Sequence, residues 1–161
     1  MPSLTEQDKT AEKPSENTMP SDAEYNLERF VVAQDSVYEQ ALGELRAGEK
    51  RSHWMWFIFP QVAGLGSSAL AQRFAIRSRE EAGAYLLHPV LGRRLRECTA
   101  AVNGLSGRTL AQIFGYPDDL KFRSSMTLFA ACGGPADTSF QTALDKYCDG
   151  QPDLRTLELL R

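Results

Sequence analysis

A dense aromatic segment, residues 50–61, sets the strongest limit on how this chain can fold. Its basic and polar beginning runs directly into six consecutive apolar residues, Trp54–Phe59, and it holds both tryptophans and one of the two histidines. The apolar run is far shorter than the ~20 residues needed to span a membrane, so it has to lie in a protein core or line a pocket. The run fits a short helix or a buried strand, and Pro60 ends either one.

Length and composition predict one folded domain with an N-terminal tail. The chain has 161 residues, of which 42% are hydrophobic, and this is enough to build a core. Residues 1–24 contain six carboxylates, two lysines and few large apolar side chains, so we expect a disordered acidic tail there. Residues 25–161 carry 15 acidic and 16 basic side chains and form the predicted globular domain.

Helix signals follow one another along residues 25–161. Ser36 and Ser78 each open a capping box, and Thr109 caps a further short helix. An apolar-periodic stretch over 118–132 predicts a longer helix. No stretch alternates between polar and apolar residues for long enough to predict a strand. The pattern therefore predicts an all-α fold, a compact single domain of about eight short helices.

Charge and cysteine usage exclude several classes of protein. The nearly neutral body lacks the concentrated basic face that nucleic-acid binding requires, so no nucleic-acid partner is expected. The three cysteines are odd in number and widely spaced, which is typical of a reduced, cytoplasmic protein, and no cysteine or histidine spacing predicts a metal site. No secretory signal, membrane-spanning run or cofactor-binding motif is present, so we predict neither a membrane partner nor a cofactor.

A second dense segment, residues 116–129, combines apolar and polar positions at helical spacing. The apolar stripe, which we expect to face the core, consists of Phe122, Met126 and Phe129. The neighbouring polar stripe consists of Asp118, Lys121 and Ser125. Two interpretations of the polar stripe stay open. It is either an Asp–Lys pair at a helix N-terminus or an anion site in which Lys121 binds while Ser124 or Ser125 donates a hydrogen bond.

The aromatic segment offers further candidates for a functional site. His53 is suited to acid–base chemistry because its ordinary pKa lies near neutrality, but it is equally an imidazole at the rim of an aromatic cluster. Trp54 and Trp56 either belong to the core or stack on a nucleobase or sugar ring. Ser52, from the polar start of the segment, and Gln61, just past Pro60, are candidate hydrogen-bonding groups.

The resemblance of this chain to known proteins rests on two long motifs, Ser-His-Trp-Met-Trp-Phe-Ile-Phe-Pro-Gln at 52–61 and Asp-Asp-Leu-Lys-Phe-Arg-Ser-Ser-Met-Thr-Leu-Phe at 118–129. Together with shorter stretches, such as His-Pro-Val-Leu-Gly at 88–92, it spans residues 25–160. The chain resembles a family of uncharacterised bacterial and fungal proteins that often carry the label calpastatin, and this resemblance implies a compact all-α domain. The label itself does not fit, because calpastatin proper is a disordered inhibitor repeat, whereas this chain has the composition of a packed globule.

The first functional hypothesis joins both segments in one pocket that binds, or hydrolyses, a nucleotide-like or phosphorylated small molecule. Its predicted catalytic residues are His53 as general acid or base, Lys121 as anion contact and Asp119 as the group that orients one of them. Its predicted ligand-binding residues are Ser52, Trp54, Trp56, Gln61, Ser124 and Ser125. Hydrolytic or glycosidic bond cleavage is the first reaction class to test, since no redox-cofactor motif is present.

The second hypothesis is a non-enzymatic protein-interaction module. In that case the aromatic segment is either core or a partner surface, and the acidic tail adjusts binding. The two hypotheses differ in space, because the first requires His53 and Lys121 to lie within one ligand length in a concave site. The oligomeric state does not follow from the residues.

Overall fold

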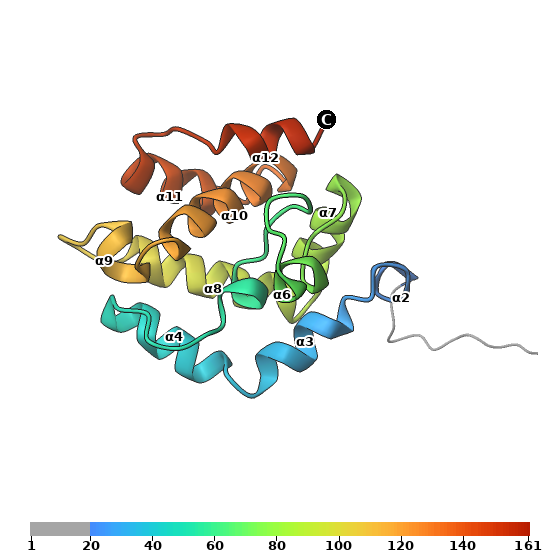
Figure 1. Cartoon of the computed structure of the whole chain (residues 1–161), viewed down its shortest axis with the longest axis horizontal. Coiled ribbons are helices and arrows are strands. Elements are labelled where there is room, and N and C mark those ends of the chain that lie inside the picture. The colour runs from blue at the N-terminus through green and yellow to red at the C-terminus, as the bar shows by residue number, and fades with distance from the viewer. Residues whose placement is uncertain (1–19) are drawn as a thin grey trace, which may run out of the picture.

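Residues 20–161 are described by a computed structural model, in which helices account for nearly all of the regular structure (Figure 1). Eleven helices lie in this range: α2 (Pro20–Tyr25), α3 (Glu28–Asp35), α4 (Tyr38–Ala47), α5 (Met55–Ile58), α6 (Ala69–Arg73), α7 (Arg79–Leu87), α8 (Leu91–Asn103), α9 (Leu110–Phe114), α10 (Asp118–Cys132), α11 (Ser139–Cys148) and α12 (Leu154–Leu159). The predicted all-α fold is confirmed. The helices outnumber the prediction because some, such as the four-residue α5, are single turns.

The predicted tail falls mostly outside this part of the chain. Residues 1–19 are not among the described residues, and the prediction for them is untested. Helix α2 begins at Pro20, inside the stretch 1–24 that the composition assigns to the tail.

Helix α8 runs through the middle of the molecule, with α3 and α4 on one side and α10, α11 and α12 on the other (Figure 1). The core lies between these layers, and its largest fully buried side chains include Phe30, Trp54, Phe59, Phe122, Phe129 and Phe140. The expected core stripe of α10 is confirmed, since Phe122, Met126 and Phe129 are all fully buried. The aromatic segment and α10 therefore meet in the core, where the Phe59 and Phe122 rings lie 5.0 Å apart in an edge-to-face arrangement.

Most of the predicted helix starts hold at the level of single hydrogen bonds. The Ser78 hydroxyl accepts from the Glu81 N–H at 3.0 Å, and Thr109 forms a full capping box with Gln112. The box predicted at Ser36 does not form, because Ser36 ends α3 and α4 begins two residues later without a side-chain cap. His88, next to Pro89 at the junction of α7 and α8, supplies a further cap. Its Nδ1 accepts from two backbone N–H groups, those of Val90 and Leu91, ahead of α8.

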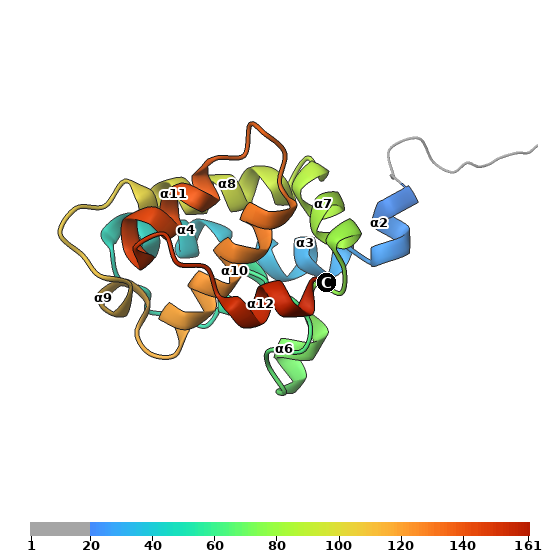
Figure 2. The same cartoon turned by 90° about the horizontal axis from the view of Figure 1, so that it is seen from above.

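The loop that carries α6 is closed by an isolated parallel bridge between Val62 and Ile76. The Ala63 N–H donates to the Ile76 carbonyl at 2.8 Å, and the Ile76 N–H donates to the Gln61 carbonyl at 2.9 Å. Helix α6 projects from the body of the molecule (Figure 2), and none of its residues is buried. The bridge therefore holds the end of the aromatic segment beside the residues that follow α6.

Candidate functional site

The aromatic segment is mainly core, with one side chain turned toward a cavity. Trp54, Met55, Ile58 and Phe59 are at most 2% exposed, so four of the six apolar residues are committed to packing. Trp56 is half-buried and lines two of the cavities described below. The two tryptophans of the motif thus have different environments.

The polar start of the segment is anchored by Glu44 of α4. One carboxylate oxygen of Glu44 accepts from the Trp54 indole at 2.9 Å and from the Arg51 N–H at 2.8 Å, and the other accepts from the Ser52 hydroxyl at 2.6 Å and from Gln40 at 3.1 Å. Burial opposes ionisation of Glu44, but these donated hydrogen bonds outweigh it and lower the pKa of the carboxyl to about 2. Ser52 and Trp54, both predicted ligand-binding residues, are therefore engaged in holding the loop.

A cleft of about 370 Å³ lies between the loop after α5, the first half of α10 and the start of α12. Four of the predicted site residues line it together: Trp56, Gln61, Lys121 and Ser124. Two segments that are 60 positions apart from Gln61 to Lys121 thus meet at one concave surface. The first functional hypothesis requires His53 and Lys121 in one concave site, and this cleft brings Lys121 to Trp56 and Gln61 but not to His53.

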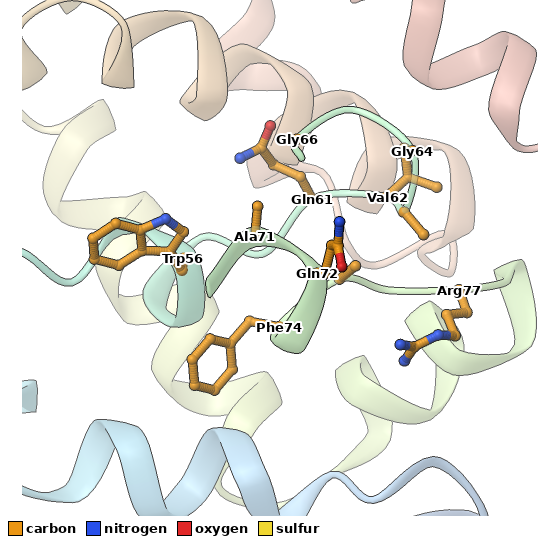
Figure 3. Close-up of a pocket in the computed structure, with 11 residues that line it drawn as sticks. Trp56, Gln61, Val62, Gly64, Gly66, Ala71, Gln72, Phe74 and Arg77 are labelled. Carbon is orange, nitrogen blue, oxygen red and sulfur yellow. The ribbon is translucent and has the colours of Figure 1, made fainter. Parts of the chain in front are cut away.

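A second cavity, of about 180 Å³, adjoins the cleft (Figure 3). The two share Trp56, Gln61, Gly66 and Ala71 in their linings, so we treat them as one groove with Trp56 and Gln61 at its centre. Ligand pockets typically span about 300–1,000 Å³, and the groove falls in that range. Arg77 lies at the end of this second cavity that is farther from Trp56 (Figure 3).

Two lysines at the cleft share one carboxylate as their ion-pair partner. The Asp118 carboxylate lies 2.9 Å from the Lys50 ammonium and 3.5 Å from the Lys121 ammonium. One anion is thus shared between two cations. Lys50 is almost fully buried and also donates to the Ser52 carbonyl, whereas the Lys121 side chain is 32% exposed and lies 5.9 Å from the centre of the Trp56 ring. Lys121 is therefore the more accessible of the two cations, and the Asp153 carboxylate lines the same cleft.

The polar groups at the centre of the groove have unused hydrogen-bonding capacity. Within residues 20–161, neither the Gln61 amide nor the Trp56 indole N–H makes a hydrogen bond. Ser124 is more committed, because its hydroxyl lies 3.2 Å from both the Leu120 carbonyl and the Asp153 carboxylate. Gln61 and Trp56 can thus meet a ligand without breaking an existing contact.

The remaining predicted residues do not line the groove. His53 is exposed and contacts neither cavity. Asp119 lines a different cavity, of about 470 Å³, beside Arg123, and its carboxylate accepts from the Leu120 N–H at 2.9 Å. Ser125 is fully buried, and its hydroxyl has no hydrogen-bond partner among the described residues. The polar stripe of α10 is therefore not a continuous surface ridge.

Two charged residues of the groove are absent from the sequence predictions. Asp153 lines the cleft and caps α12, since its carboxylate accepts from the Thr156 N–H at 3.1 Å. The Asp-Leu pair at the start of the last helix carries that capping signal, but nothing local places it near Lys121. Arg77 reaches the groove through the bridge between Val62 and Ile76, a pairing that sequence periodicity does not reveal.

Metal binding and membrane insertion find no support in this part of the chain. Among the described residues, no three His, Cys, Asp or Glu side chains are grouped to hold a metal ion. No helix between residues 20 and 161 is long and apolar enough to cross a membrane. Cys98, Cys132 and Cys148 are free thiols, and burial raises the pKa of each.

Together, the fold and the groove define a small all-α domain with a ligand-sized surface site. The chain belongs to the DUF1810 family, described as a protein of unknown function, which matches residues 24–160. It is similar to the crystal structure of the conserved hypothetical protein Rv1873 from Mycobacterium tuberculosis. The identity is 56%, the match covers 85% of this chain and 97% of that chain, and the TM-score is 0.83. Among curated proteins, no match is found.

Proposed function

We propose that this protein binds a phosphorylated, nucleotide-like small molecule in the groove centred on Trp56 and Gln61. The observation that carries the proposal is the meeting of three unlike groups at one concave surface. A half-buried indole, an unengaged amide and an incompletely neutralised ammonium, those of Trp56, Gln61 and Lys121, line the same cleft. Such a combination of one aromatic wall with a few polar groups is typical of small-molecule sites.

The Trp56 ring and the Gln61 amide together suit a flat heterocyclic ligand. Trp56 offers a large rigid ring at the wall of the cleft, and stacking of a base on an aromatic side chain contributes about 1–3 kcal/mol. Gln61 offers both donors and an acceptor for the polar edge of such a ring. Its backbone is held by the bridge to Ile76, so the amide is presented from a fixed position.

The anionic part of the ligand is recognised by Lys121. A lysine ammonium binds phosphate as a point charge, and Lys121 keeps part of its charge available because Asp118 also serves Lys50. The nearby Asp153 carboxylate repels a second anion at this end of the groove, but its capping role at α12 directs one oxygen toward the helix N-terminus.

These residues support binding more directly than hydrolysis. A general acid or base has to reach the reacting atoms, and His53 does not line the groove. The carboxylate that does line it, Asp153, already accepts from Ser124 and Thr156. Bond cleavage therefore stays a prediction from the sequence. The cytoplasmic location, for which the groove offers no test, is likewise a prediction from the sequence.

The alternative of a protein-interaction module is narrowed by the aromatic segment. Most of that segment is core, as the low exposure of Trp54, Met55, Ile58 and Phe59 indicates. Within the segment only the aromatic side chains of Trp56 and Phe57 are partly exposed, which is too little for an aromatic partner surface, so an interaction module would have to bind its partner through another face.

Titration calorimetry and thermal unfolding with adenosine 5′-monophosphate test the proposal. We expect binding that raises the unfolding temperature, and an affinity at least about tenfold weaker, or about 1.4 kcal/mol, in Lys121→Ala and in Trp56→Ala. Arg93→Ala is the matched control, because Arg93 is an exposed cation on α8 whose ion-pair partner in the described part of the chain is Glu97. Absence of binding by the monophosphate, by ribose 5-phosphate and by adenosine would overturn the proposal and favour the interaction module.

A further inference from the structure

We infer that the ligand of this groove carries a second anionic group, bound by the guanidinium groups of Arg73 and Arg77. This inference rests on the proposed function, because it narrows the ligand class to nucleotide-like molecules phosphorylated at two separate positions. One phosphate lies at Lys121 and the other at the opposite end of the groove.

Arg77 stands where the groove meets a further cavity. It lines the 180 Å³ part of the groove, and it also lines a neighbouring cavity of about 420 Å³ together with Arg29 and Arg73. Figure 3 shows Trp56 and Arg77 at opposite ends of the 180 Å³ cavity, with Gln72 between them. Lys121 lines one part of the groove and Arg77 lines the other, so a ligand that occupies both parts meets two cations.

The three arginines of the 420 Å³ cavity are not equivalent. Arg29 is nearly buried and uses all of its donors, on the carbonyls of Tyr25, Asn26, Arg73 and Ala75 and on the Glu81 carboxylate at 3.0 Å. In contrast, the guanidinium groups of Arg73 and Arg77 make no hydrogen bond or ion pair with residues 23–161, and Arg73 only lies over the Phe74 ring at 5.2 Å. Arg29 is therefore part of the scaffold, while Arg73 and Arg77 have free donors.

The free donors at this cavity favour an anion there. Arg29 is matched by Glu81. Glu24 lines the cavity, and Glu80 lies close enough to contribute, after burial, to the raised pKa of Tyr25, which also lines it. The attraction for an anion therefore comes from the unengaged guanidinium groups of Arg73 and Arg77 and not from a net positive charge of the cavity. Guanidinium groups bind phosphate through paired hydrogen bonds, which makes this end more selective for a phosphate than a lysine would be.

The backbone around Arg77 is held from both sides. The preceding residue, Ile76, is bridged to Gln61, and the Arg77 N–H donates to the Glu81 carboxylate at 2.9 Å. Gln61 at the centre of the groove and Arg77 at its end are thus positioned by the same bridge. A pre-positioned pair of this kind binds a ligand with less loss of conformational entropy.

The test compares adenosine 5′-monophosphate with adenosine 3′,5′-bisphosphate by titration calorimetry on the full chain. We expect the bisphosphate to bind at least about tenfold more tightly than the monophosphate, since each added phosphate gains charge-assisted hydrogen bonds. The double variant R73Q/R77Q is expected to lose this gain. R73Q alone, at a residue that lines the 420 Å³ cavity and not the groove, is expected to reduce the gain while keeping the affinity for the monophosphate. Arg93→Gln on α8 is the matched control, and thermal unfolding verifies that every variant folds.

The outcomes separate the inference from the proposed function. If the monophosphate binds through Lys121 but the bisphosphate binds no more tightly, the inference is overturned and the proposed function stands. The same conclusion follows if R73Q/R77Q keeps the full gain. If neither nucleotide binds, the proposed function fails, and the inference fails with it.

Discussion

Trp54 and Trp56 are two positions apart in one motif, yet the fold uses them in opposite ways. Trp54 is 1% exposed and donates its indole N–H to the Glu44 carboxylate, so its aromatic surface and its polar atom are both satisfied internally. Trp56 is half-buried, lines the groove and makes no hydrogen bond through its indole N–H within the described range. The same residue type therefore stabilises the fold at one position and is available to a ligand at the other.

The difference follows from the start of α5. Trp54 is the residue before the helix and has a non-helical backbone conformation, whereas Trp56 lies within its single turn, so the two side chains point in different directions and only one indole enters the core. A motif rich in aromatic residues is thus not one functional unit. Its hydrogen-bond partners, rather than its composition, decide which member can meet a ligand.

Removing each indole gives the largest expected effect and the most direct test of this contrast. Trp54→Ala is expected to lower the free energy of unfolding by about 4–5 kcal/mol, because it leaves a cavity and removes a donor from Glu44. Trp56→Ala is expected to lower it by only about 2 kcal/mol, since part of its surface is already in water. Urea denaturation followed by circular dichroism measures both. Equal losses in the two variants would contradict the division of roles.

Glu44 is the next residue to test, because it holds the polar start of the segment. Glu44→Ala is expected to lower the free energy of unfolding by about 4 kcal/mol, since it leaves the donors of Ser52, Arg51 and Trp54 without their shared acceptor. Glu39→Ala, on the exposed side of the same helix, serves as the control and is expected to change the value by less than about 0.5 kcal/mol. A loss in Glu44→Ala no larger than in the control would show that the network is dispensable.

Low pH offers a further test of the difference between the two tryptophans. Protonation of Glu44 weakens the acceptor of the Trp54 indole, whereas the Trp56 indole makes no such hydrogen bond within the described range. Hydrogen bonds to Glu44 lower its pKa from an ordinary 4.5 to about 2, so its contribution is fully present above pH 4.5 and is lost as the pH falls toward 2. Across that window we expect this carboxylate to contribute at most about 3 kcal/mol to the free energy of unfolding, less whatever solvent screening removes. Urea denaturation at a series of pH values measures it. Glu44→Gln cannot lose a charge there, so an unchanged acid dependence in this variant would contradict the assignment.

Much of the fold could be predicted from the sequence because its determinants are local. The caps at Ser78 and Thr109 and the core stripe of α10 depend only on residues within a few positions of each other. The failure at Ser36 is also local, since α3 and α4 are so close in the chain that their ends compete for the same residues.

The site was predictable only in part, since it depends on contacts between distant segments. Residue type correctly marks Gln61 and Lys121 as polar groups beside apolar runs, and both line the cleft. Residue type does not reveal that Glu44 engages Ser52 or that the bridge to Ile76 brings Arg77 to the groove. Those contacts join segments whose separation leaves no periodic signal.

The smallest expected effect concerns His53, one residue before Trp54. Its side chain is exposed and makes no hydrogen bond or ion pair with the described residues, so His53→Ala is expected to change the free energy of unfolding by less than about 0.5 kcal/mol. We also expect it to leave the affinity for adenosine 5′-monophosphate unchanged, because His53 lines neither part of the groove. The same calorimetric titration that tests Lys121→Ala measures this. A tenfold loss of affinity in His53→Ala would extend the site to the polar start of the segment and revive the acid–base role that the sequence predicts for this imidazole.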